Sequence, residues 1–122
     1  MQSPVTVTLP TLKVVWVSSS HKDLCSFPDA VKRQFGFTLG AVQRAVTNLK
    51  HIKVWAGPYA KSFEIKLSVR GDTFRLVYTT RRNGLLFVLH VFQKKSHQGS
   101  ATPREHIETI NHRQRAVDIH KE

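Results

Sequence analysis

The sequence is poor in the residues that mark disulfide-linked, metal-binding or membrane-spanning proteins. It holds one cysteine, Cys25, in 122 residues, so no disulfide can form within the chain and a reducing cytoplasm is the expected compartment. No apolar run reaches the roughly 18 residues that a membrane span needs. The seven histidines show no spacing typical of zinc sites. We therefore expect no metal, no other cofactor and no association with a membrane.

Motifs of several enzyme classes are also missing from the sequence. It contains no GxGxxG, no P-loop, no GxSxG and no HExxH pattern. Acidic residues are scarce as well, because 8 Asp and Glu stand against 19 Lys and Arg, which gives a formal net charge of +11. Such an excess favours a polyanionic partner, namely a nucleic acid, an acidic protein or an anionic surface. The alternative is a charged surface that only keeps the protein in solution.

The length fits one domain, and the local patterns predict its elements. Residues 1–11 are interpreted as a flexible extension, and residues 12–120 as the single domain. The β-branched run 12–17 predicts a strand, and the serines at 18–20 are candidate N-caps for a short helix over 21–27. A second helix is expected after Pro28, since apolar residues recur at helical spacing. Its stripe consists of Val31, Phe35, Leu39, Val42, Val46 and Leu49.

The second half of the chain predicts a meander of strands and a last helix. Residues 50–60 contain Gly57-Pro58 and are interpreted as a loop. Strands are expected over 62–69, 73–80 and 85–92, the last one apolar enough to be covered on both faces. Thr102-Pro103 opens a helix with a capping box. The fold class is therefore α+β: a strand, two helices, a three-stranded antiparallel meander and a C-terminal helix, with the helices on one face of a small sheet.

Alternation along the strands places charged residues together on the open face of this sheet. If Ile65 and its apolar neighbours face the helices, Glu64 and Lys66 face away from them, and the same holds for Arg75 on the next strand. Only one of Lys94 and Lys95 can point to this face. Arginine and lysine in such a group suit phosphate oxygens. The alternative is a solvated face with an ordinary ion pair.

The segment from Asp72 to Pro103 resembles the phage-related HigB-type toxins of the RelE/ParE superfamily. Its marks are an R-x-V-Y strand starting at Arg75, the V-L-H-x-F-Q-K-K-S run of residues 88–96, and A-T-P before the last helix. The resemblance implies a RelE-like fold and a type II toxin that cleaves mRNA in the ribosomal A site without metal. It also implies neutralisation by a cognate helix-turn-helix antitoxin.

The resemblance implies roles for individual residues as well. Arg75 matches the phosphate-stabilising arginine of the superfamily, and Lys94 and Lys95 stand where relatives carry catalytic residues. Glu64 is a secondary candidate for the base or for orienting a lysine. The other residues expected to bind RNA are Lys53, Lys61, Lys66, Arg81, Arg82 and His90.

Three interpretations stay open at this point. His90 lies inside an apolar strand, which favours a hydrogen-bonded core histidine over a residue of the site. ParE-type members of the superfamily inhibit DNA gyrase on the same fold, so a non-enzymatic inhibitor is one alternative function. The other is a basic nucleic-acid-binding module without catalysis.

Overall fold

The computed structural model describes residues 11–46, 49–55, 62–81, 83–94 and 102–119. The proposed extension, residues 1–11, lies almost wholly outside these ranges. The described elements are β1 (Lys13–Trp16), α1 (Ser20–Cys25), α2 (Asp29–Gln43), β2 (Ile52–Val54), β3 (Ser62–Val69), β4 (Asp72–Thr80), β5 (Leu85–Lys94) and α3 (Arg104–Ile119). The predicted α+β class is therefore confirmed. Among the described residues no helix is long and apolar enough to span a membrane.

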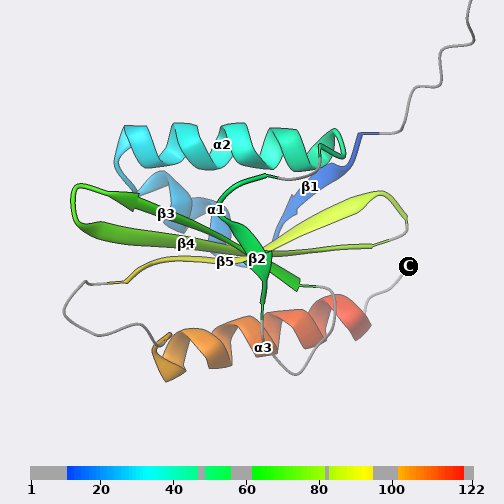
Figure 1. Ribbon diagram of the computed structural model, residues 1–122. Coiled ribbons are helices and arrows are strands. Elements are labelled where there is room, and N and C mark those ends of the chain that lie inside the picture. The colour runs from blue at the N-terminus through cyan, green and yellow to red at the C-terminus, as the bar shows by residue number, and fades with distance from the viewer. Residues whose placement is uncertain (1–10, 47–48, 56–61, 82, 95–101, 120–122) are drawn as a thin grey trace, which may run out of the picture.

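The strands form one sheet in the order β1-β5-β4-β3-β2. β1 pairs in parallel with β5, and the other neighbours are antiparallel. Figure 1 shows α1 and α2 on one side of the sheet and α3 on the other. The expectation that all helices share one face was wrong. Because β5 is apolar on both faces, as predicted, it needs cover on both, and α3 supplies the second layer.

β2 is a strand that the sequence did not predict. Residues 50–60 were expected to form a loop, but Ile52–Val54 pairs with β3 and forms the edge of the sheet. Three residues are too few to show a strand pattern, so only the pairing identifies them. The register places Lys53 opposite Glu64. The extra strand thus brings a lysine to the charged part of β3.

The second helix is shorter than its apolar stripe suggested. It ends at Gln43, and Ala45 has a positive φ of 60°. The N–H of Val46 donates to the carbonyl of Ala41, and the N–H of Ala45 donates to that of Val42. This is a Schellman motif, in which glycine is the usual residue at the left-handed position. Alanine in that place left no sequence signal for the end of the helix.

A β-bulge in β5 decides which residues face α3. Val77 of β4 pairs with His90, whereas the next residue, Tyr78, pairs with Val88, so Leu89 is the extra residue. Before the bulge, Val88 faces the core under α1 and α2. After it, the alternation is inverted, and Phe92 faces α3.

Two apolar clusters hold the layers together. The larger one lies between the sheet and the helices α1 and α2, and it includes the fully buried Val31 and Phe35 of α2. The smaller one lies under α3, where Ile110 and Val117 pack against the other face of the sheet. The sheet residues of this smaller cluster are Val77, Leu89 and Phe92.

Ile110→Ala tests how strongly this smaller cluster stabilises the fold. The side chain is 1% exposed, so its truncation leaves a cavity and should lower the free energy of unfolding by about 2–4 kcal/mol. Urea unfolding followed by circular dichroism measures the change. The control is Ile119→Ala, a matched change on the same helix at a side chain that is 73% exposed. It should alter stability by less than about 0.5 kcal/mol; equal losses would contradict the packing described for α3.

Candidate functional site

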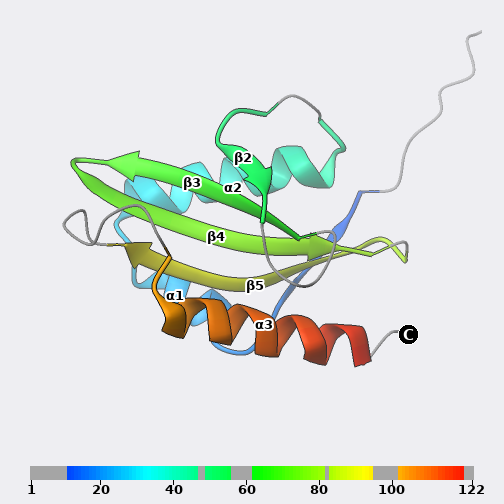
Figure 2. The ribbon, with the colours of Figure 1, turned by 60° about the horizontal axis from the view of Figure 1, so that its bottom comes forward.

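α3 does not extend over the whole of its side of the sheet. Figure 2 shows the helix running along β5, while the same face of β3 and β4 is not covered by a helix. The side chains that β3 and β4 direct to this face include a carboxylate and several cations. We call this group the cationic cluster; it consists of Lys53, Glu64, Lys66, Arg75 and Lys94.

The centre of the cluster is a buried ion pair. Arg75 Nη1 donates to Glu64 Oε2 at 2.8 Å, and the side chains are 6% and 1% exposed. Lys53 Nζ lies 3.5 Å from the other oxygen, Oε1. Both carboxylate oxygens are therefore engaged by cations. Removing either member of such a pair leaves a buried charge without a partner, which is strongly unfavourable.

The Nε of Arg75 differs from its Nη1 in having no acceptor among the described residues. Its Nε is buried and has no hydrogen-bond partner within the described part of the chain. A buried N–H without an acceptor costs on the order of 1–3 kcal/mol, so proteins rarely retain one. The bond from Nη1 to Glu64 holds the guanidinium in one orientation.

Lys94 lies beside this pair and is only 3% exposed. Its neighbour across the strands is Thr73, two residues before Arg75, and Lys66 lies directly opposite Arg75. Burial lowers the pKa of Lys94, and the charges of Arg75 and Lys66 lower it further, against a smaller opposing effect of Glu64. A part of the Lys94 population is thus neutral at a lower pH than for an ordinary lysine.

The cluster can bind a phosphate and move a proton. Four cations surround one carboxylate, so the group carries an excess of positive charge. Arginine and lysine at this density match the oxygens of a phosphodiester. A lysine with a lowered pKa can accept a proton and return it.

Several residues that the strand alternation predicted on one face of the sheet do lie on one face. The structure brings Glu64, Lys66, Arg75 and Lys94 to one face, together with Lys53. Lys61, Arg82 and Lys95 lie outside the described residues. Arg81 lies at the other end of the sheet face, where it forms an ion pair with Asp118 of α3 and donates to Thr79 and to the carbonyl of Thr80. Its contacts are those of an anchor for α3.

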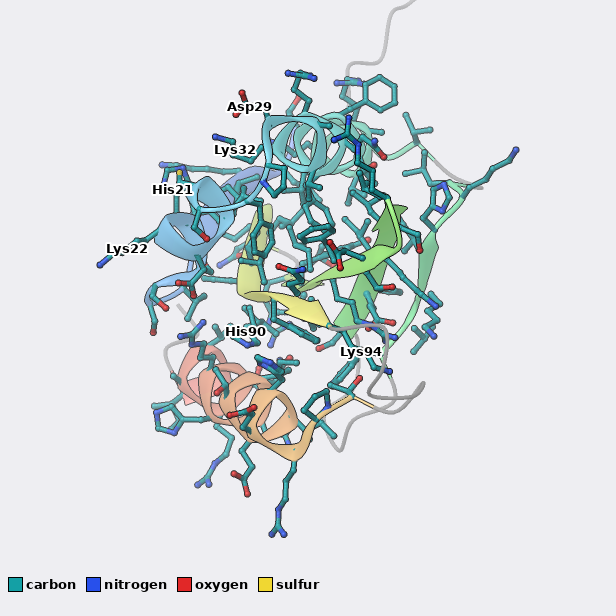
Figure 3. The ribbon with its side chains drawn as sticks, turned by 90° about the vertical axis from the view of Figure 1, so that its left-hand side faces the viewer. His21, Lys22, Asp29, Lys32, His90 and Lys94 are labelled. Carbon is teal, nitrogen blue, oxygen red and sulfur yellow. The ribbon has the colours of Figure 1, made fainter. Side chains whose placement is uncertain are left out.

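His90 lies between β5 and α3, beside the cluster. Figure 3 shows it between the sheet and the helix, with Lys94 further along the same strand. His90 is 7% exposed, and its Nε2 lies 2.9 Å from Nδ1 of His106. Arg113 Nη1 lies 3.4 Å from His90 Nδ1 and donates to the carbonyl of Leu89 at 2.8 Å. His90 is therefore a hydrogen-bonded histidine under α3.

His106 and Phe92 were not among the residues predicted for the site. Their rings stack at 4.2 Å with an interplanar angle of 16°. Phe92 pairs with Arg75 across the strands, so the stack borders the cationic cluster. The capping box did predict a helix near residue 103, but with all helices assigned to the opposite face, no residue of this helix could be placed at the site.

Other parts of the surface carry less chemistry. A hollow of about 680 Å³ lies between the end of α2 and the strands β2–β4, and its lining is mainly apolar, including Val46, Ile52 and Phe63. Among the described residues no three His, Cys, Asp or Glu side chains are grouped as metal ligands. The cationic cluster is the better candidate for binding and catalysis.

A family model described as "Phage derived protein Gp49-like (DUF891)" matches residues 22–115. The chain belongs to this Gp49-like family. The family is one of the RelE/HigB-like toxin families, so the resemblance seen in the sequence is confirmed. No protein with curated annotation gives a significant match.

The fold agrees with the family. A structure of a double mutant of the toxin RelE of E. coli, in the free state, superimposes with a TM-score of 0.58 at 18% sequence identity. The match covers 88% of this chain and 98% of that one. At this identity the likeness shows a shared fold, which this Gp49-like protein therefore has in common with RelE.

The buried His90 predicts a loss of stability in acid. Burial lowers its pKa from 6.5 to about 4, and Arg113 and His106 add to the effect while Asp23 opposes it. Unfolded His90 takes up a proton near pH 6.5, whereas folded His90 does so only near pH 4. Its contribution to stability is therefore complete above pH 6.5 and is lost as the pH falls toward 4, by up to about 3 kcal/mol.

Urea unfolding between pH 7.5 and 4 measures this loss. His90→Gln removes the titrating group, so its stability should fall less steeply over this range than that of the unchanged protein. His112→Gln, at an exposed position of α3, is the matched control and should keep the original slope. Identical slopes for His90→Gln and the unchanged protein would contradict the assignment.

Proposed function

We propose that this Gp49-like protein is the toxin of a type II toxin–antitoxin system and acts as an endoribonuclease that cleaves mRNA in the ribosomal A site without using a metal. The observation that carries the proposal is the cationic cluster, in which Glu64 holds Arg75 in one orientation and the buried Lys94 lies beside the pair. Membership in a RelE/HigB-like toxin family supports it. The structure of the RelE toxin, which shares the fold, adds to this support.

The reaction that fits this cluster uses a nucleophile within the RNA itself. A ribose 2′-oxygen attacks the adjacent phosphorus, its proton passes to a base, and the bond from phosphorus to the 5′-oxygen breaks. The leaving 5′-oxygen takes up a proton, so the products are a 2′,3′-cyclic phosphate and a 5′-hydroxyl. The protein must then supply proton transfer and stabilise the additional negative charge on the phosphate.

Arg75 is the residue proposed to stabilise that charge. Glu64 holds Nη1 at 2.8 Å, which fixes the guanidinium before RNA binds. Such preorganised donors are most effective where charge develops in the transition state. Glu64 itself has Arg75 on one oxygen and Lys53 on the other, so we propose that it positions Arg75 and is not the base.

Lys94 is the residue proposed to transfer the proton. Its lowered pKa favours the neutral amine, which can accept the proton of the 2′-hydroxyl. Lys66 and Lys53 extend the positive surface across β3 and β2 and are proposed to contact neighbouring phosphates. Lys61 and Arg82 remain proposed contacts of the same kind, and Lys95 remains a proposed catalytic residue beside Lys94.

The same reasoning suggests the partners. A family of toxins implies an antitoxin. We propose that it is a helix-turn-helix protein, that it neutralises this toxin with acidic segments placed over the cationic cluster, and that both act in the cytoplasm. Charge complementarity of this kind gives fast association and specificity.

Primer extension on mRNA in a translating extract tests the proposed reaction. Arg75→Ala should reduce cleavage by about 100-fold or more, the usual effect of removing a donor to a developing charge. Lys94→Arg keeps the positive charge but cannot become neutral, so it should also abolish most of the cleavage. Lys22→Ala, at an exposed lysine of α1, is the control and should cleave normally.

Stability has to be measured alongside, because Arg75→Ala leaves Glu64 buried without its partner. The double variant Glu64→Gln, Arg75→Ala removes that charge and should recover stability without recovering cleavage. No cleavage by the unchanged protein, or full cleavage by Arg75→Ala, would contradict the proposed reaction. Inhibition of DNA supercoiling in its place would favour a gyrase inhibitor.

A further inference from the structure

His106 lies at the border of the cationic cluster although it belongs to another element. It is in the first turn of α3, and its ring stacks on Phe92 at 4.2 Å. Phe92 is opposite Arg75 in the sheet and two residues before Lys94 on the same strand. Side chains paired in this way lie about 5 Å apart at Cβ, so the ring of His106 is close to the cations of the cluster.

The neighbours of His106 determine which of its nitrogens carries the proton. Arg113 has only donors, and its Nη1 faces Nδ1 of His90 at 3.4 Å, so this Nδ1 must carry a lone pair. A neutral His90 then has its proton on Nε2, which donates to Nδ1 of His106 at 2.9 Å. His106 in turn has its own proton on Nε2. Within the described residues this Nε2–H has no hydrogen-bond partner.

The hydrogen bonds from Arg113 to His90 and from His90 to His106 thus leave an oriented donor at the edge of the site. Burial lowers the pKa of His106, with Glu105 opposing the effect, which favours the neutral ring and with it this tautomer. Stacking on Phe92 fixes the plane of the ring. A fixed imidazole N–H of this kind suits an oxygen acceptor on a ligand that occupies the cluster.

We propose that His106 is an RNA-contacting residue that donates a hydrogen bond from Nε2–H to a phosphate or ribose oxygen beside the cleaved bond. The inference rests on the proposed function, because it takes RNA as the ligand of the cationic cluster. The ammonium groups of the lysines attract the backbone from any direction, whereas this donor has one orientation. His106 would therefore contribute to the positioning of the RNA.

Two substitutions separate the donor from the ring. His106→Phe keeps an aromatic ring against Phe92 but has no N–H, and His106→Gln keeps an amide N–H near the position of Nε2. Cleavage in the translating extract should fall about tenfold or more in His106→Phe, in line with the loss of one hydrogen bond to a charged group, and should be largely recovered in His106→Gln. His112→Phe, at an exposed position of α3, is the matched control and should cleave normally.

A direct measurement of the contact does not depend on cleavage. In ¹⁵N-labelled protein, long-range ¹H–¹⁵N spectra of the imidazoles report the tautomer of each histidine. His106 should show the Nε2–H form, and His90→Phe should remove this preference. On addition of a mixed-sequence RNA hexamer in which every 2′-hydroxyl is methylated, and which therefore cannot be cleaved, the His106 Nε2 resonance should shift while that of His112 stays unchanged.

The outcomes distinguish this inference from the proposed function. If the unchanged protein cleaves mRNA and His106→Phe cleaves equally well, the contact is wrong and the proposed function stands. If the unchanged protein does not cleave but the His106 resonance shifts with the hexamer, the contact is supported and the proposed catalysis fails. A His106 resonance that does not respond to the hexamer, or a His106 ring protonated on Nδ1, overturns the inference.

Discussion

The extra residue in β5 is the constraint on which both the packing of α3 and the candidate site depend. Leu89 has no partner in β4, and its insertion inverts the alternation of every residue that follows it. Without this inversion, Phe92 and Lys94 would face α2 and not α3. The carbonyl of Leu89 accepts a hydrogen bond from Arg113 at 2.8 Å. Arg113 also donates to Ser19 at the start of α1, so one guanidinium links the bulge to both layers of helices.

The Glu64–Arg75 pair is costly to bury, and its position explains why the fold keeps it. A buried ion pair seldom adds stability when compared with apolar residues of the same size. Here the pair lies beside the part of the sheet that α3 covers, among three further cations. Glu64 offsets part of their mutual repulsion and holds Arg75 in one orientation. What the pair provides is a preorganised cation, which an apolar replacement would remove.

The sequence predicts those features of the structure that depend on neighbouring residues in the chain, and it does not predict those that depend on pairing between strands. The alternation in β3 and β4 is local, and it correctly placed Glu64, Lys66 and Arg75 on one face. The bulge at Leu89 is not local, because nothing within an apolar run marks which residue lacks a partner. The choice between Lys94 and Lys95 therefore could not be made from the sequence.

The errors in the predicted fold have the same origin. β2 exists as a strand through its pairing with β3, and three residues alone carry no periodicity. α3 has few apolar residues, so its pattern did not show which face of the sheet it would cover. Its place follows from Ile110 and Val117, which fit a second apolar surface created partly by the bulge. His106 was missed for this reason, since it is near the cluster only when α3 lies on that face.

α3 also determines where the positive charge of the molecule is available. Near its C-terminus, Asp118 pairs with Arg81, and in its middle, Gln114 accepts a hydrogen bond from Ser62 at 2.5 Å. Near its N-terminus the contacts are of another kind, because His106 meets the sheet through His90 and Phe92 without an acidic residue directed at the cations. The helix therefore neutralises the arginine at one end of the sheet face and leaves the cluster at the other end in excess of positive charge. One amphipathic helix thus both completes the core and confines the excess of positive charge to one end of this face of the sheet.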